Sequence, residues 1–125
     1  MSETINWTVN VQVERGPTIS KSGAIIVDAY DKIGVAVAAN ATKTIEVQPG
    51  AAGRVQFLLI NSDLFDNALT YAPDGGNAIP LDALQVLFGN GAVGLLGAPP
   101  QTLDVTNGTA QDPVNIEVIV GRQAI

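Results

Sequence analysis

Apolar and polar residues alternate strictly near the start of the chain. The apolar positions are Ile5, Trp7, Val9, Val11 and Val13, each separated from the next by a polar residue. Because successive side chains of a strand point to opposite faces, this period of two predicts a strand with one buried and one solvated face. Residues 15–17 (Arg-Gly-Pro) are expected to end it, since proline cannot donate to a sheet ladder.

The most apolar run bounded by turn residues is 53–61, which reads Gly-Arg-Val-Gln-Phe-Leu-Leu-Ile-Asn. In an extended chain Phe57 and Leu59 face one way, while Leu58 and Ile60 face the other, so both faces are apolar. A strand that is apolar on both faces is typical of the centre of a sheet. We therefore predict that 53–61 is the central strand.

Period-two patterns predict further strands along the chain. Residues 24–39 fit two strands joined by a turn at 30–32; the same stretch also fits an alanine-rich helix from Gly34, but its β-branched content favours strands. The remaining predicted strands are 42–48, 70–72, 84–88, 93–95, 103–105 and 114–120.

Turn and cap signals separate these segments. Asn90-Gly91 lies between two alternating runs and is the strongest hairpin signal in the chain. Ser62 is a candidate cap for a short helical turn that would place Leu64 and Leu69 on one side. About eight or nine short strands at this spacing are expected of a two-sheet sandwich, a jelly roll or a small barrel. We predict an all-β fold, a single antiparallel β-sandwich domain over residues 1–125 that is jelly-roll-like, with at most one short helical turn.

The charge content changes the picture of the surface. Only 14% of the 125 residues are charged, with 6 Lys and Arg against 12 Asp and Glu and a net charge of −6; roughly 25% is usual. Either amides and hydroxyls cover the surface, or part of it is buried against a partner. We predict a homo-oligomer. Nucleic acid and membrane-surface partners are not expected, because the bases are scattered in a negative field.

The chain starts with the polar residues Met1-Ser2-Glu3-Thr4, without the basic and apolar regions of a signal peptide. We therefore predict a location in the cytoplasm or within an assembled particle. The absence of cysteine agrees with a reducing compartment.

Catalysis is not predicted, since the chain has no His and no Cys. That composition rules out nucleophilic triads, Cys-His dyads and His-ligated zinc or iron. The carboxylates are dispersed over predicted turns and solvated strand positions, so no acid–base pair is evident. We predict that the protein is not an enzyme and needs no cofactor.

Calcium is the cation that suits the oxygen ligands of the 61–67 loop. The candidate ligands are Asn61, Asp63, Asp66 and Asn67, joined by Asp74 and Asn77 if the 61–67 and 72–77 loops share one end of the sandwich. Their spacing matches no EF-hand, and Asp and Asn are also the residues that turns use to bond their own backbone.

The 72–77 loop is also a candidate sugar-binding site. Tyr71 would stack on a pyranose ring, while Asp74 and Asn77 would hydrogen-bond its hydroxyls. The competing interpretation is that Tyr71 packs against the end of a strand and its hydroxyl reaches water.

Several apolar residues are expected to point away from the core face. They are Leu58, Ile60, Leu87, Leu96 and Ile119. Either loops of the same chain or a closed barrel cover them, or they form a subunit interface. Because the low charge content points the same way, we predict the interface.

The functional prediction is a non-catalytic, homo-oligomeric structural or assembly module, with a carbohydrate- or calcium-binding module as the alternative.

Overall fold

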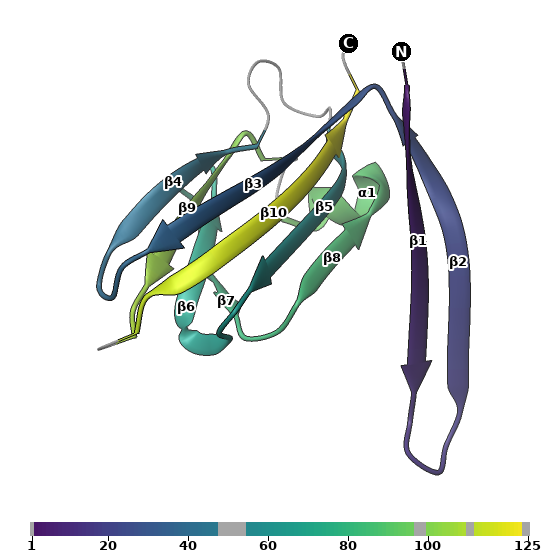
Figure 1. The fold of residues 1–125 in the computed structure, drawn as a ribbon, viewed down its shortest axis with the longest axis horizontal. Helices are drawn as coiled ribbons and strands as arrows, with labels where there is room; N and C mark the ends of the chain where they lie inside the picture. The colour runs from purple at the N-terminus through teal and green to yellow at the C-terminus, as the bar shows by residue number, and fades with distance from the viewer. Residues whose placement is uncertain (1, 48–54, 97–99, 110–111, 124–125) are drawn as a thin grey trace.

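The computed structural model describes residues 2–47, 55–96, 100–109 and 112–123 (Figure 1). Two four-stranded antiparallel sheets pack face to face. The first sheet contains, in spatial order, β3 (Ala29–Val37), β10 (Val114–Arg122), β5 (Val55–Ser62) and β8 (Gln85–Phe88). The second contains β4 (Thr42–Glu46), β9 (Thr102–Asn107), β6 (Asp66–Pro73) and β7 (Ile79–Leu81). The predicted all-β sandwich is confirmed.

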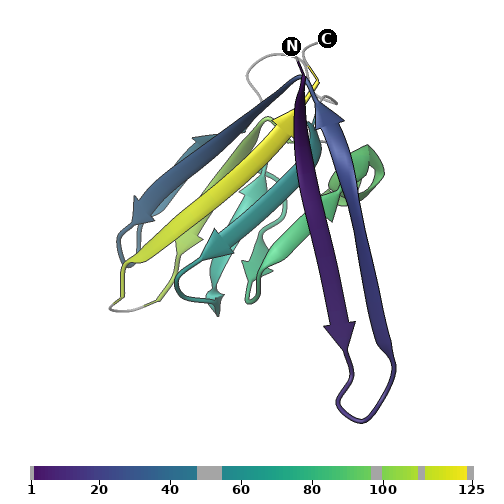
Figure 2. The same ribbon diagram turned by 45° about the vertical axis from the view of Figure 1, so that its right-hand side comes forward.

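A two-stranded hairpin stands beside the sandwich and extends past it (Figures 1 and 2). It consists of β1 (Glu3–Gln12) and β2 (Thr18–Val27), and we call residues 3–27 the arm. Within the described part of the chain, β1 and β2 form ladder pairs only with each other. The first predicted strand is thus confirmed, but it belongs to the arm and not to the sandwich.

The arm joins the sandwich through a short break at Asp28, where β2 ends and β3 begins. The backbone amide of Asp28 donates to the carbonyl of Arg122 (3.0 Å), which ties the break to β10. The turn predicted at 30–32 is wrong, because these residues pair along β10 as part of β3. The local pattern does not distinguish the break at Asp28 from the predicted turn around Asp31, since at both positions a carboxylate interrupts an apolar run.

Strand β5 occupies the centre of the first sheet, as predicted for 53–61. It pairs with β10 on one side and β8 on the other. Leu58 and Ile60 point into the core between the sheets and are 0% and 1% exposed, while Leu59 points outward. The expectation that Leu58 and Ile60 form an interface is therefore wrong. When both faces of a strand are apolar, its pattern cannot tell which face meets the core.

The sandwich core is built from the inward positions of both sheets. Its fully buried members include Val37, Ile45, Val105, Ile116, Val118 and Val120. Residues of β10 alternate buried and exposed along the strand, as predicted for 114–120.

The hairpin predicted at Asn90-Gly91 is wrong. The chain forms a short helix, α1 (Gly89–Val93), continued by a 3-10 turn, η1 (Gly94–Leu96). Gly89 has a φ of 84°, which starts the helix by turning the chain away from β8. The Asn90 side chain then donates to the Val55 carbonyl (3.1 Å), and this contact to β5 replaces a turn between two strands.

The helical turn predicted after Ser62 is also wrong. The Ser62 hydroxyl does accept a hydrogen bond from the Leu64 amide (3.2 Å), but the chain then enters β6 at Asp66. Asp66 pairs with Leu81 of β7, and from Leu69 onward β6 pairs with β9, so the chain is a strand where a helical turn would continue. Tertiary pairing thus overrides the local cap.

Candidate assembly surface

The outer face of the β3-β10-β5-β8 sheet carries two apolar rows across three strands. In the first row, Phe57 of β5 lies between Gly121 of β10 and Phe88 of β8. In the second row, Leu59 lies between Ile119 and Val86. The next position along β10 and β5 is polar, where Glu117 pairs with Asn61. The two rows therefore form an apolar patch at one end of this face.

The base of the arm covers the first row. The Trp7 and Phe88 ring centroids lie 4.7 Å apart, and the Phe57 and Phe88 rings 5.7 Å apart. Ile5 lies so close to the backbone of Gly121 that a Cβ there would be 2.7 Å from its Cδ1. As a result Phe57 is only 4% exposed.

Gly23 makes room for this contact. It lies directly opposite Trp7 in the hairpin, and a Cβ at Gly23 would be 2.7 Å from the indole ring. The indole therefore lies across the bare backbone of β2. This explains a glycine inside a strand, where it otherwise costs stability.

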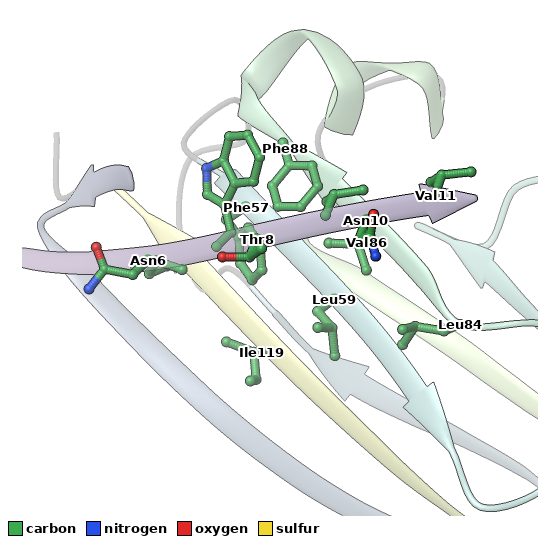
Figure 3. Close-up of a pocket in the computed structure, with 13 residues that line it drawn as sticks. Asn6, Thr8, Asn10, Val11, Phe57, Leu59, Leu84, Val86, Phe88 and Ile119 are labelled. Atoms are coloured by element: carbon green, nitrogen blue, oxygen red, sulfur yellow. The ribbon is translucent and has the colours of Figure 1, made fainter. Parts of the chain in front are cut away.

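The second row lies in a cleft of about 820 Å³ between the sheet and β1 (Figure 3). On the sheet side the cleft is lined by Leu59, Leu84, Val86 and Ile119. On the arm side it is lined by Val9 and Val11, together with Asn6, Thr8 and Asn10 of β1. Phe57 and Phe88 complete the sheet side, so the floor of the cleft is aliphatic and aromatic and offers no ionisable group.

Beyond the cleft, the arm exposes apolar side chains to solvent. Val11 is 54% exposed, Val13 54% and Ile19 64%. Val11 and Ile19 pair across the hairpin, and the alternation places them on the same face as Trp7. An isolated two-stranded hairpin is at best marginally stable in water. The distal arm therefore has an apolar face and no partner for it within the described part of the chain.

Charge is distributed unevenly between the arm and the rest of the chain. The arm carries two acids, Glu3 and Glu14, and two bases, Arg15 and Lys21, so the net charge of −6 resides in the other residues. The arm can thus approach the acidic body of another molecule without net repulsion.

The outer face of the other sheet is polar but nearly free of bases. Cross-strand hydrogen bonds join the hydroxyls of Thr42 and Thr106 (3.0 Å), and the Thr44 hydroxyl donates to Asp104 (2.7 Å). Hydroxyls therefore cover this face, as one of the two explanations for the low charge content requires. Most of the exposed large apolar side chains lie on the arm and on the face beside it, with Leu95 and Phe65 as exceptions.

Of the five residues predicted to form an interface, Ile119 lies on the outer face, in the second row. Leu87 and Leu96 are partly buried against the core, and Leu58 and Ile60 lie within it. Sequence reasoning missed Leu59, Val86 and the distal arm. The signal for the arm was present in the alternation of 5–13, which was interpreted as a sandwich strand.

The predicted calcium ligands serve the chain's own backbone. Asp63 accepts hydrogen bonds from the Asn115 backbone amide (3.0 Å) and side-chain amide (2.9 Å), and these bonds lower the pKa of Asp63. Asp66 accepts from the Ala68 amide (2.8 Å), and Asn61 donates to Glu117 (3.4 Å). Asn67 is exposed at the start of β6. Within residues 2–47, 55–96, 100–109 and 112–123, no three acidic side chains are grouped as metal ligands.

The two loops proposed to share a site lie at opposite ends of β6. Asp63 and Asp66 precede or begin that strand, whereas Asp74 and Asn77 follow it. Asp74 accepts hydrogen bonds from the backbone amides of Gln101 (2.8 Å) and Thr102 (3.0 Å), and Asn77 is exposed. Asp74 and Asn77 therefore cannot join the other four residues around one ion.

Tyr71 cannot stack on a sugar, because it is fully buried in the core. Its hydroxyl donates to the side-chain oxygen of Gln85 on β8, and burial raises the pKa of Tyr71 to about 12. The expectation of a stacking platform at Tyr71 is wrong, because Tyr71 lies at a position of β6 whose side chain points into the core.

In the part of the chain that the structure describes, no helix has the length and apolar character to cross a bilayer. No protein-family model, curated protein or solved structure matches this chain.

Proposed function

We propose that the protein is a non-catalytic, homo-oligomeric structural module that assembles through its arm, as a component of a larger particle. One observation carries this proposal: the arm extends an apolar face past the body of its own molecule, beside an apolar row that is only partly buried. A single chain does not bury these surfaces fully, whereas association of copies would.

The strand order supports a role of this kind. The orders β3-β10-β5-β8 and β4-β9-β6-β7 are compatible with a jelly roll, in which two Greek keys form a double sheet. Jelly rolls recur in capsid and lectin domains, so the fold alone is compatible with both assembly and sugar binding. The buried Tyr71 and the exposed apolar face of the distal arm favour assembly over sugar binding.

Burial of the arm supplies the driving force. Fully burying a Val or Ile side chain contributes roughly 1.5–3 kcal/mol relative to leaving it exposed. Val11, Val13 and Ile19 are each more than half exposed. Burying them against another copy would therefore contribute several kcal/mol toward association. The loss of translational and rotational entropy on association opposes this gain.

Sedimentation equilibrium at tens of micromolar tests the proposal. We expect the chain to sediment as an oligomer, and Ile19→Lys to shift it toward the monomer, because a charge then replaces the apolar contact. Thr18→Lys adds the same charge to the neighbouring residue on the opposite face of β2 and is expected to have little effect. A monomeric wild-type chain, or equal effects of the two substitutions, would contradict the proposal.

A further inference from the structure

We propose that the cleft between β1 and the second row receives the distal arm of a second copy of this chain. This inference rests on the proposed function, since it names the acceptor surface through which copies associate. Within one molecule the arm contacts only one of the two apolar rows closely. The base of the arm covers the first row, but the distal arm passes beyond the sheet (Figure 2) and leaves the second row only partly buried in the cleft (Figure 3).

The chemistry of the cleft matches that of the distal arm. The apolar face that places Trp7 on the first row continues with Val9 and Val11 on β1 and with Ile19 on β2. Aliphatic side chains from a second copy would pack on the apolar floor of the cleft. Polar side chains line the cleft only on the β1 side, so a strand, which is apolar toward the sheet and carries backbone donors and acceptors along β1, matches both sides.

The edge of β1 adds backbone groups to the site. Asn6, Thr8 and Asn10 line the cleft, and β1 pairs on its other side with β2. Within the described residues no strand pairs with this edge. An incoming strand can therefore hydrogen-bond along β1 while its alternate side chains enter the cleft.

Charge complementarity selects the arm over any other part of a second copy. The body carries the whole net charge of −6, so two bodies repel, whereas the arm is neutral. Lys21 lies on the apolar face of the arm, opposite Val9. Glu117, whose side chain is 49% exposed, borders the second row two residues before Ile119 on β10, where it forms an ion pair with Lys32 (3.5 Å). Charge complementarity therefore comes from the neutral arm as a whole and not from a single new ion pair.

Disulfide trapping tests the site directly, because the chain has no cysteine of its own. Ile19→Cys labels the apolar face of the distal arm, and Leu84→Cys labels the rim of the cleft. Both positions are more than half exposed, at 64% and 52%, so the substitutions leave the core intact. The two single variants, one carrying an affinity tag, are mixed in equal amounts and oxidised. Thr18→Cys, on the opposite face of the arm, replaces Ile19→Cys in the control mixture.

We expect the Ile19→Cys and Leu84→Cys mixture to form the mixed disulfide about 100-fold faster than the control, because binding raises the effective thiol concentration from about ten micromolar to about millimolar. Equal rates in the two mixtures, from a chain that sediments as an oligomer, would overturn this inference and leave the proposed function standing. A monomeric chain would overturn both. A double variant that cross-links within one molecule at high dilution would also overturn the inference, since the cleft would then close on its own arm.

Discussion

Replacing Trp7 by alanine should release the arm from the sandwich without unfolding the sandwich. The indole packs on Phe88 of the sandwich at a centroid distance of 4.7 Å. The sheets do not depend on it, because their cores lie between β3-β10-β5-β8 and β4-β9-β6-β7 and include no residue of the arm. The free energy of arm docking and the free energy of global unfolding should therefore respond differently.

The size of the effect follows from the burial of the ring. A fully buried aromatic side chain hides about 150–250 Å²; for the half-buried Trp7 we take roughly 100 Å², which at about 25 cal/mol per Å² gives about 2.5 kcal/mol. The contact with the Phe88 ring adds roughly 0.5–1.5 kcal/mol. A total of about 3 kcal/mol corresponds to a roughly 100-fold increase in the population of undocked arms.

Native-state hydrogen exchange measures this population, at a dilution where the chain sediments as a monomer. Amides of β1 and β2 should exchange roughly 100-fold faster in Trp7→Ala, while those of β5 and β10 keep the wild-type rate. Thr8→Ala changes the adjacent residue on the opposite face and should leave all rates nearly unchanged. If β5 and β10 accelerate as much as β1, the arm is part of one cooperative unit and the reasoning fails.

Three further predictions concern the sandwich, each measured as the free energy of unfolding. Asn107→Ala should lower it by about 2–4 kcal/mol, because the buried amide donates to two carbonyls (3.1 and 2.7 Å), whereas exposed Asn77→Ala should change it by less than about 0.5 kcal/mol. Leu58→Asp should cost more than about 4 kcal/mol or prevent folding, because Leu58 is buried in the core. Leu59→Asp should cost far less and weaken association. Equal costs would refute the assignment of Leu58 to the inner face of β5 and Leu59 to the outer face. Raising the pH from 10 to 12 should destabilise the wild-type chain by on the order of 1–3 kcal/mol, because the phenol of Tyr71 ionises near 10 when unfolded and near 12 when buried; Tyr71→Phe should lack this loss.

The strands of the sandwich could largely be predicted from alternation, because that pattern reports which side chains share a face. The faces themselves could not always be assigned. In β5 both faces are apolar, and only the pairing with β10 and β8 shows that Leu58 points to the core and Leu59 to the cleft. The strand β2 was missed over 18–23 because Lys21 and Gly23 interrupt its apolar face. Gly23 is explained only by the ring of Trp7 that lies across it.

The candidate site was harder to predict than the fold, for a related reason. Carboxylates and amides in loops suggested ion binding, but Asp63, Asp66 and Asp74 each accept hydrogen bonds from backbone amides of nearby segments. A sequence shows the donors and acceptors of a loop without showing which of them the loop itself consumes. The distance between the two loops, set by the length of β6, was likewise invisible until the strand was placed between them.

The low charge content has different causes on different surfaces of the molecule. On the outer face of the β4-β9-β6-β7 sheet, threonine hydroxyls bond across the strands, so that face is solvated without many charges and needs no partner. The face that carries the second row, and the distal arm beside it, have aliphatic side chains in place of hydroxyls. A chain selected only for solubility as a monomer would gain from polar residues at Val11, Ile19 and Leu59, because none of these three positions is buried in the core. Apolar side chains at these positions are what the proposed contact with another copy requires. The hydroxyl-covered outer face of the other sheet shows that a low charge content alone does not make a surface of this chain apolar.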